Sequence, residues 1–198
     1  MNFIFDFGAV LVDWNPHYVF DPYFGSREKA DWFLANICTA AWNGEMDGGK
    51  PFAQGVAELQ ALHPEWAPEI ELYWKQWKNM MGDAIPGMYE LLQELKAAGH
   101  KLYGLTNWSS ETFYQIEGNY PVFGLLDGKV VSGDVKLLKP SPEIFHCVLE
   151  RFGLKAGECL FIDDNAANVA GALAVGIPAL QFIDEPSLRQ QLLKLCQF

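Results

Sequence analysis

The sequence predicts an α/β protein with a doubly wound parallel sheet flanked by helices and a small all-helical cap inserted into it. Four short apolar runs, each bounded by turn signals, alternate with segments of helical periodicity. This alternation is typical of parallel strands joined by right-handed helical crossovers. One long stretch near the N-terminus interrupts the alternation and carries only helical signals, which predicts the cap.

The four apolar runs have the length and composition of strands buried on both faces. The first run ends at Asp6, and the others follow in the second half of the chain. The expected strands are residues 2–5, 101–105, 158–162 and 178–182.

The segments between these runs carry helix start and stop signals. Residues 86–100 place apolar side chains at helical spacing. Residues 141–154 repeat that pattern, with Pro142 at the first helical position and Gly153 as terminator. Residues 165–178 are rich in small side chains, which predicts a short helix that lies close against the sheet.

Residues 15–83 are expected to form the cap, and residues 1–14 together with 84–198 the core. Six of the seven Trp residues lie in the cap if Trp14 at its edge is counted. Helices are expected near residues 27–36, 51–62 and 68–81, with a glycine-flexed loop at residues 42–52 that could reach the active pocket or simply connect two helices. The alternative to a cap is an ordinary helical extension packed on the core.

Composition excludes several classes of protein. Half of the 198 residues are hydrophobic, which is enough to bury the core of a globular domain. The net charge of −11 repels polyanions, so no nucleic-acid partner is expected. The apolar stretches are too short to span a membrane, and the N-terminus lacks a secretory signal, so a cytoplasmic location is expected. The four scattered cysteines predict neither disulfides nor zinc.

Polar residues follow the predicted strands at the points where the strands end. In an open α/β sheet these carboxyl ends face a crevice where functional groups gather. Two adjacent acids directly after "CLFI" would repel each other unless a cation or hydrogen-bond donors lay between them. The polar residues at this edge are Asp6, Thr106, Asn107, Lys139, Asp163 and Asp164.

These residue types fit phosphoryl transfer. The Asp6 carboxylate could attack phosphorus and form an aspartyl phosphate, which divides hydrolysis into two easier displacements. Thr106, with Asn107 and the free amides beside it, could donate hydrogen bonds to phosphate oxygens. Lys139 would add a positive point charge near the phosphate, which Pro140 helps to fix in place. Each residue alone has a plainer explanation as a turn, a helix cap or solvated surface; together and in this order they predict a site.

The same edge predicts a magnesium site. Oxygens of Asp6, Asp163 and Asp164, with the Gly8 carbonyl, form the hard donor set that Mg²⁺ prefers. A cation is needed because a carboxylate that attacks a phosphate dianion meets like charge.

The motifs around these residues resemble those of the haloacid dehalogenase-like hydrolase superfamily over nearly the whole chain. "FIFDFGAVLVD" is similar to its first motif, "LYGLTNWS" to its second, "KPSPEIF" to its third and "LFIDDNAANVAGA" to its fourth. The resemblance implies a Rossmann-like core with a small helical cap after the first motif. It implies Asp6 as nucleophile and Thr106 as phosphate binder. It also implies that Lys139 holds the nucleophile and the phosphoryl group, and that Asp164 is the main magnesium ligand of the fourth motif.

Within the superfamily, the motifs look most like those of bacterial sugar-phosphate phosphatases of the glucose-1-phosphate phosphatase kind. One position departs from the usual phosphatase motif, because Gly8 stands where a second Asp protonates the leaving group. Water, the substrate or a cap side chain such as His17, Asp47 or Glu45 would then supply the proton. A sugar 1-phosphate needs this help least, since its anomeric hydroxyl is a good leaving group.

Two other functions stay open. A metal-independent 2-haloacid dehalogenase also uses an Asp nucleophile without the second Asp, although paired acids beside a substrate carboxylate would be repulsive there. A protein that binds a phosphorylated ligand without turnover would also fit the missing acid. The favoured reading is a magnesium-dependent phosphatase of a small phosphorylated metabolite, acting as a monomer or weak homodimer.

Overall fold

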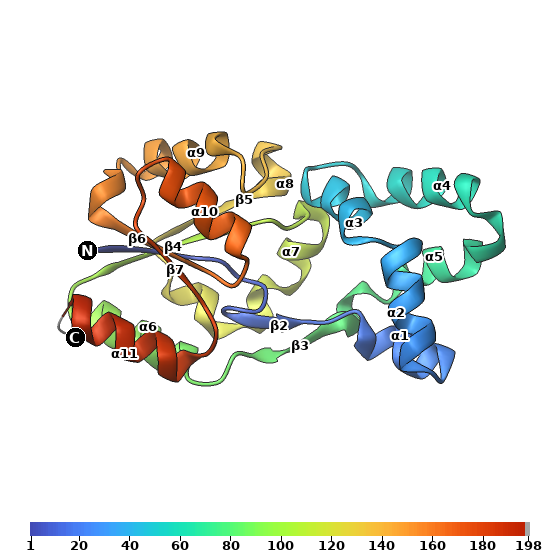
Figure 1. Cartoon of the computed structure of the whole chain (residues 1–198), viewed down its shortest axis with the longest axis horizontal. Helices are drawn as coiled ribbons and strands as arrows, with labels where there is room; N and C mark the ends of the chain where they lie inside the picture. The colour runs from blue at the N-terminus through green and yellow to red at the C-terminus, as the bar shows by residue number, and fades with distance from the viewer. Residues whose placement is uncertain (197–198) are drawn as a thin grey trace.

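The computed structural model describes residues 1–196 and contains a five-stranded parallel sheet at its centre (Figure 1). The strand order is β5-β4-β1-β6-β7, so the N-terminal strand lies in the middle. The strands are β1 (Asn2–Phe5), β4 (Lys101–Thr106), β5 (Gly128–Val131), β6 (Cys159–Asp163) and β7 (Ala179–Gln181). This architecture confirms the predicted fold class.

Helices cover both faces of the sheet, and alternate side chains of β1 serve the two faces. Phe3 and Phe5 pack in the cluster that includes the apolar sides of α6 and α11, whereas Ile4 packs against α9 and α10. Figure 1 shows these two helix pairs on opposite sides of the sheet. The core helices are α6 (Met88–Ala97), α7 (Ser110–Ile116), α8 (Ser132–Val135), α9 (Pro142–Phe152), α10 (Ala166–Ala174) and α11 (Glu185–Leu195), with 3-10 turns at Glu117–Asn119, Pro121–Leu125 and Ala156–Glu158.

The predicted strands and helices are present, with ends that differ by one or a few residues. Gly153 ends α9 in the left-handed conformation, with φ of 63°, as expected for a terminator. The sequence analysis did not foresee β5, because its four residues begin with the pair Gly-Lys and lie at the sheet edge with little hydrophobic signal.

The cap segment folds as helices at one end of the molecule, away from the sheet (Figure 1). Its elements are α1 (His17–Phe24), α2 (Arg27–Asn36), α3 (Ala40–Asp47), α4 (Phe52–Leu62) and α5 (Ala67–Lys75), with 3-10 turns at Pro64–Trp66 and Trp77–Met80. The loop expected at residues 42–52 is wrong in its first half, because α3 continues through Asp47. The Thr39 side chain caps this helix by accepting from the Trp42 amide, a signal that the glycines of the segment obscured.

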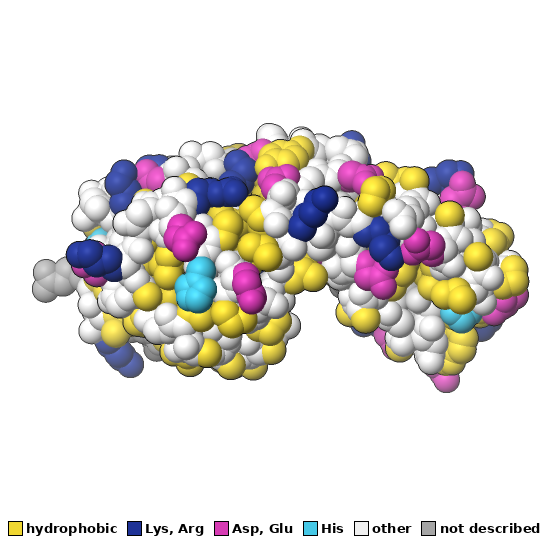
Figure 2. All heavy atoms as spheres, turned by 90° about the horizontal axis from the view of Figure 1, so that it is seen from above, with side chains coloured by type: hydrophobic (Ala, Val, Ile, Leu, Met, Phe, Trp, Pro, Cys, Tyr) yellow, Lys and Arg dark blue, Asp and Glu magenta, His cyan; other side chains and the backbone are white. Residues whose placement is uncertain are grey.

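Two short antiparallel strands, β2 (Val12–Trp14) and β3 (Met81–Ala84), carry the chain between the sheet and the cap. Figure 2 shows the surface hollowed between the two lobes that they join. The exact boundaries of the cap, at residues 15 and 83, stay a prediction. In residues 1–196 no helix combines the length and apolar character that crossing a bilayer requires.

Candidate active site

The carboxyl ends of β1, β4 and β6 bring the predicted polar residues to one edge of the sheet. Asp6 follows β1 directly, Thr106 is the last residue of β4, and Asp163 is the last residue of β6. All three are buried. The parallel register places them side by side, as the sequence analysis expected.

Lys139 links two of these carboxylates. Its Nζ lies 2.8 Å from Oδ1 of Asp6 and 2.6 Å from Oδ2 of Asp163, and all three side chains are buried. Burial by itself would lower the pKa of Lys139, but the two carboxylates outweigh it and the pKa is raised. Lys139 is therefore a fixed positive charge between two acids.

Only one oxygen of Asp6 is engaged in this arrangement. Oδ1 accepts from the Phe7 amide at 2.7 Å as well as from Lys139. No group of residues 1–196 hydrogen-bonds to Oδ2. Burial raises the pKa of Asp6, Lys139 opposes that rise and Asp163 adds to it. A cation at Oδ2 would favour the ionised form that a nucleophile needs.

Asp163 and Asp164 play different parts, although they are adjacent. Oδ1 of Asp163 accepts from the Asn165 amide at 2.8 Å, and the Asn168 amide group lies 3.1 Å from both carboxylate oxygens. Asp164 is exposed as a residue, but its carboxyl group is partly shielded from water. This shielding and the charge of Asp163 raise its pKa. Asp163 thus orients Lys139, while Asp164 remains available to a ligand. Asn168 was missed by the sequence analysis, although its place on the first turn of a helix after the paired acids is a usable signal.

The three acids fit a divalent cation. One carboxylate oxygen from each of Asp6, Asp163 and Asp164 lies within 4.8 Å of the others. These are hard oxygen donors, and the unengaged Asp6 Oδ2 and exposed Asp164 are the groups that a Mg²⁺ ion would neutralise. Gly8, whose carbonyl is predicted as a further ligand, is one of the residues that line the adjoining cavity.

Asn107 supports Lys139 with its side chain. Its Nδ2 donates to the Lys139 carbonyl and its Oδ1 accepts from the Lys139 amide, both at 2.9 Å. The side-chain amide is therefore occupied, and the phosphate contact of Asn107 stays a prediction. Thr106 lines the cavity described next.

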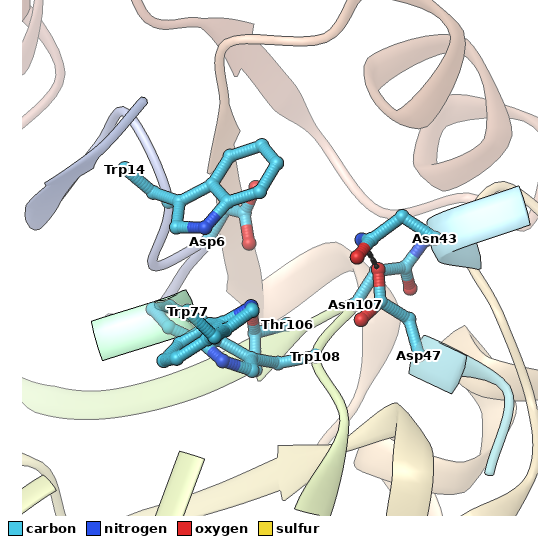
Figure 3. A pocket seen from close by; sticks show the side chains of 9 residues that line it. Asp6, Trp14, Asn43, Asp47, Trp77, Thr106, Asn107 and Trp108 are labelled. Carbon is cyan, nitrogen blue, oxygen red and sulfur yellow. Dashed lines mark hydrogen bonds between the residues drawn. The ribbon is translucent and has the colours of Figure 1, made fainter. Parts of the chain in front are cut away.

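A cavity of about 120 Å³ opens beside Asp6 between the core and the cap. Figure 3 shows three indole side chains, of Trp14, Trp77 and Trp108, on one side of it and the Asn43–Asp47 pair on the other. The Trp14 Nε1 donor is buried and has no hydrogen-bond partner among residues 1–196. The nine lining residues are Asp6, Gly8, Trp14, Asn43, Asp47, Trp77, Thr106, Asn107 and Trp108.

Of the three cap side chains considered as proton donors, Asp47 lines the cavity and the other two do not. His17 pairs with Asp21 at 2.7 Å within the cap, and Glu45 pairs with Lys50. Asn43 and Asp47 lie one turn apart on α3, so their side chains are neighbours. A loop at this position does not predict that relation.

Comparisons with known proteins show what the chain as a whole is similar to. A sesquiterpene phosphatase of Aspergillus oryzae is 28% identical over 198 residues, covering 97% of this chain and 94% of the relative. A flavin mononucleotide hydrolase of Arabidopsis thaliana is 32% identical over 109 residues, covering 54% of this chain and 44% of the relative. A solved magnesium complex of a haloacid dehalogenase family enzyme from Bacteroides thetaiotaomicron has the same fold, with a TM-score of 0.76 at 20% identity, covering 96% of this chain and 97% of that one.

The particular resemblance to sugar 1-phosphate phosphatases remains a prediction, because these relatives act on other kinds of ester by name. The family model described as haloacid dehalogenase-like hydrolase matches residues 23–176. Since that match covers most of the chain, the protein belongs to the haloacid dehalogenase-like hydrolases.

Proposed function

We propose that the protein is a magnesium-dependent phosphatase that hydrolyses small phosphomonoesters through an aspartyl phosphate on Asp6. The observation that carries the proposal is the unengaged Oδ2 of Asp6 beside two further acids and at the wall of a cavity. The phosphatase and hydrolase names of the relatives support it. The neighbour solved with magnesium supports the choice of metal.

In this proposal the residues of the site divide the work. Asp6 attacks the phosphorus atom, and Lys139 keeps the attacking carboxylate in place and offsets part of the phosphate charge. The hydroxyl of Thr106 and the amide of Asn107 donate to the non-bridging phosphate oxygens. A Mg²⁺ ion held by Asp6, Gly8, Asp163 and Asp164 would supply charge neutralisation that lets two anions approach.

The cavity favours a small ester, with sugar phosphates as the leading class. Its volume of about 120 Å³ lies below the roughly 300 to 1,000 Å³ typical of drug-sized ligands. Indole rings pack well against the apolar face of a sugar, and the unpartnered Trp14 Nε1 can donate to a sugar oxygen. Flavin mononucleotide and prenyl phosphates are larger and would need the cap to move away.

The test is a panel of esters assayed for phosphate release with Mg²⁺ and again with EDTA, using the wild type and Asp6→Asn. We expect turnover with Mg²⁺, with sugar 1-phosphates ahead of flavin mononucleotide and prenyl phosphate. Asp6→Asn should lower kcat by at least about 10³-fold because it removes the nucleophile, and chelation should do so because it removes the charge that lets Asp6 approach the phosphate.

Three outcomes would contradict the proposal. Unchanged turnover in a folded Asp6→Asn variant would show that Asp6 is not the nucleophile. Halide release from 2-haloacids that survives EDTA would favour the dehalogenase. A single burst of phosphate without steady turnover would favour the phosphate-ligand-binding protein. Sedimentation of the same sample tests the expected monomer or weak homodimer.

A further inference from the structure

The proposed reaction leaves one proton unassigned. When the bond between phosphorus and the ester oxygen breaks, the departing alkoxide needs a proton unless it is already a stable anion. Gly8 occupies the position two residues after Asp6 and has no side chain to supply it. The donor therefore has to come from elsewhere in the cavity wall, on the side where the alcohol part of the substrate would lie.

Asp47 is the carboxylic acid that the cavity wall offers besides the nucleophile. The lining contains indoles, carboxamides, a hydroxyl and a glycine, none of which is an effective acid near neutral pH. Lys139, Asp163 and Asp164 gather around Asp6 itself, on the metal side of the site. Asp47 comes from the cap, across the cavity from Trp14 (Figure 3).

The Asp47 side chain is held in one orientation by both lobes. Its Oδ1 accepts from the Ser109 amide of the core at 3.0 Å, and its Oδ2 accepts from Asn43 Nδ2 of the cap at 2.9 Å. Its backbone carbonyl accepts from the Ser132 hydroxyl at 2.6 Å. Asn43 is fixed in turn by the Tyr73 hydroxyl, which donates to its Oδ1 at 3.2 Å. Each carboxylate oxygen has a second lone-pair position at which the proton can be carried.

The surroundings of Asp47 favour its protonated form at pH values up to about neutral, where a general acid has to hold its proton. Burial raises its pKa to about 7, the charge of Asp6 adds to the rise, and the donors from Ser109 and Asn43 oppose it. Asp6 is the charged group that acts on the pKa of Asp47. The other charged groups of the neighbouring segments are engaged elsewhere: Glu45 pairs with Lys50, Glu111 accepts from the Phe52 amide, and Asp134 accepts from the Ser110 hydroxyl. A protonated Asp47 also avoids repelling the phosphate dianion.

We propose that Asp47 is the general acid and base of this site, an inference that rests on the proposed phosphatase function. In the first half-reaction, a bond forms between Asp6 and phosphorus, the ester bond breaks, and the Asp47 proton passes to the alkoxide oxygen. In the second, water attacks phosphorus, the bond to Asp6 breaks, and the water proton returns to Asp47 as inorganic phosphate is released. Protons and charge balance over the cycle.

The test compares two esters of nearly the same size that differ in their need for a proton. Ethyl phosphate releases an alkoxide, whereas acetyl phosphate releases acetate, which leaves without help. For Asp47→Asn we expect kcat/KM for ethyl phosphate to fall about 10²- to 10⁴-fold, the usual range for general acid catalysis. For acetyl phosphate kcat/KM should stay within about threefold, because Asn keeps the shape of the side chain.

A second variant checks the role by moving the acid. A Cβ at Gly8 would meet no atom within 4 Å, so the site has room for Gly8→Asp. In the Asp47→Asn background this change should restore at least about tenfold of the lost ethyl phosphate activity. If Asp47→Asn lost activity only through altered packing around residue 47, an acid at position 8 would not restore it.

Failure of this inference is distinguishable from failure of the phosphatase proposal. If the wild type turns over both esters and Asp6→Asn turns over neither, the phosphatase stands. An equal loss of kcat/KM for the two esters in Asp47→Asn would then overturn the acid role, because kcat/KM reports only the first half-reaction. Full retention of kcat/KM for ethyl phosphate would overturn it as well. If the wild type turns over neither ester with Mg²⁺, both proposals fall.

Discussion

Lys139 shows how a few fixed contacts decide the chemistry of a single residue, Asp6. The ammonium group and the Phe7 amide both engage Oδ1 of Asp6, which leaves Oδ2 as the atom that faces a metal or a substrate. Asp163 secures the same lysine from the other side, and Asn168 secures Asp163. Removing the Asp163 side chain would therefore affect the position of Asp6 indirectly, because Lys139, which contacts both, would lose one of its two anchors.

At this scale we predict that Asp47→Asn stabilises the protein above neutral pH. The pKa of Asp47 is about 7 in the folded protein against 3.8 for the free side chain, so the folded state holds a proton that the unfolded state releases between these values. Wild-type stability is therefore lost as pH rises from about 4 to 7, and the neutral Asn avoids that loss. The gain at pH 8 should be on the order of 4 kcal/mol, which is the equivalent of about three pKa units, or about 8 to 16 °C in Tm.

Thermal unfolding of both proteins at pH 5 and pH 8, in EDTA, measures this difference. The Tm advantage of Asp47→Asn should grow between the two values. An advantage that is equal at both would mean that Asp47 is not buried in a neutral form.

The helix α10 illustrates how an element positions the site from outside it. Its small residues let it pack closely against the loop that contains Lys139. A Cβ at Gly171 would lie 2.6 Å from the carbonyl oxygen of Pro140, a backbone atom that has no freedom to rotate away. The glycine therefore sets the separation between this helix and the residue that follows Lys139.

We predict that Gly171→Ala lowers both stability and activity. The added methyl group must push α10 away from the loop, which costs about 1 to 3 kcal/mol by overpacking. The same displacement moves Lys139, so kcat should fall by at least about tenfold. Gly157→Ala is the control, because a Cβ at Gly157 meets no atom within 4 Å. Equal melting temperatures and rates for the two variants would show that α10 accommodates the methyl group without loss of stability or activity.

On the scale of the whole molecule, the cap is docked onto the core by hydrogen bonds at two helix ends. The last residue of α3, Asp47, bonds to Ser109 and Ser132 of the core. The first amide of α4, at Phe52, donates to Glu111 of α7 at 3.2 Å. These contacts satisfy helix-terminal groups that would otherwise need water. The cavity of about 120 Å³ lies between the two lobes that these contacts hold together.

We predict that Glu111→Ala weakens docking of the cap. The N-terminal amide of α4 loses its acceptor and the favourable charge near the helix terminus. A hydrogen bond worth about 0.5 to 1.5 kcal/mol corresponds to a two- to tenfold rise in KM with little change in kcat. Glu111→Gln keeps an acceptor and should behave as the wild type. X-ray scattering should show a larger radius for the Ala variant alone; the same radius and KM in both variants would contradict this role.

Much of this protein follows from the sequence alone. The apolar runs fix the strands because a sheet covered on both faces needs continuous hydrophobic segments. Asp6, Thr106 and Asp163 end those runs, and parallel strands necessarily bring their ends to one edge. The magnesium and phosphoryl-transfer predictions needed only those two facts and the types of residue involved.

The tertiary structure decided what sequence periodicity does not encode. Asp47 and Trp14 line the cavity beside Asp6 because the end of α3 bonds to Ser109 and Ser132 of the core, and the three residues Asp6, Trp14 and Asp47 belong to different elements. The Asn107 side chain also supports Lys139, because the two loops lie within hydrogen-bond distance, while its phosphate contact stays a prediction. Such contacts between segments distant in the chain depend on packing, whereas strands and helices follow from local pattern.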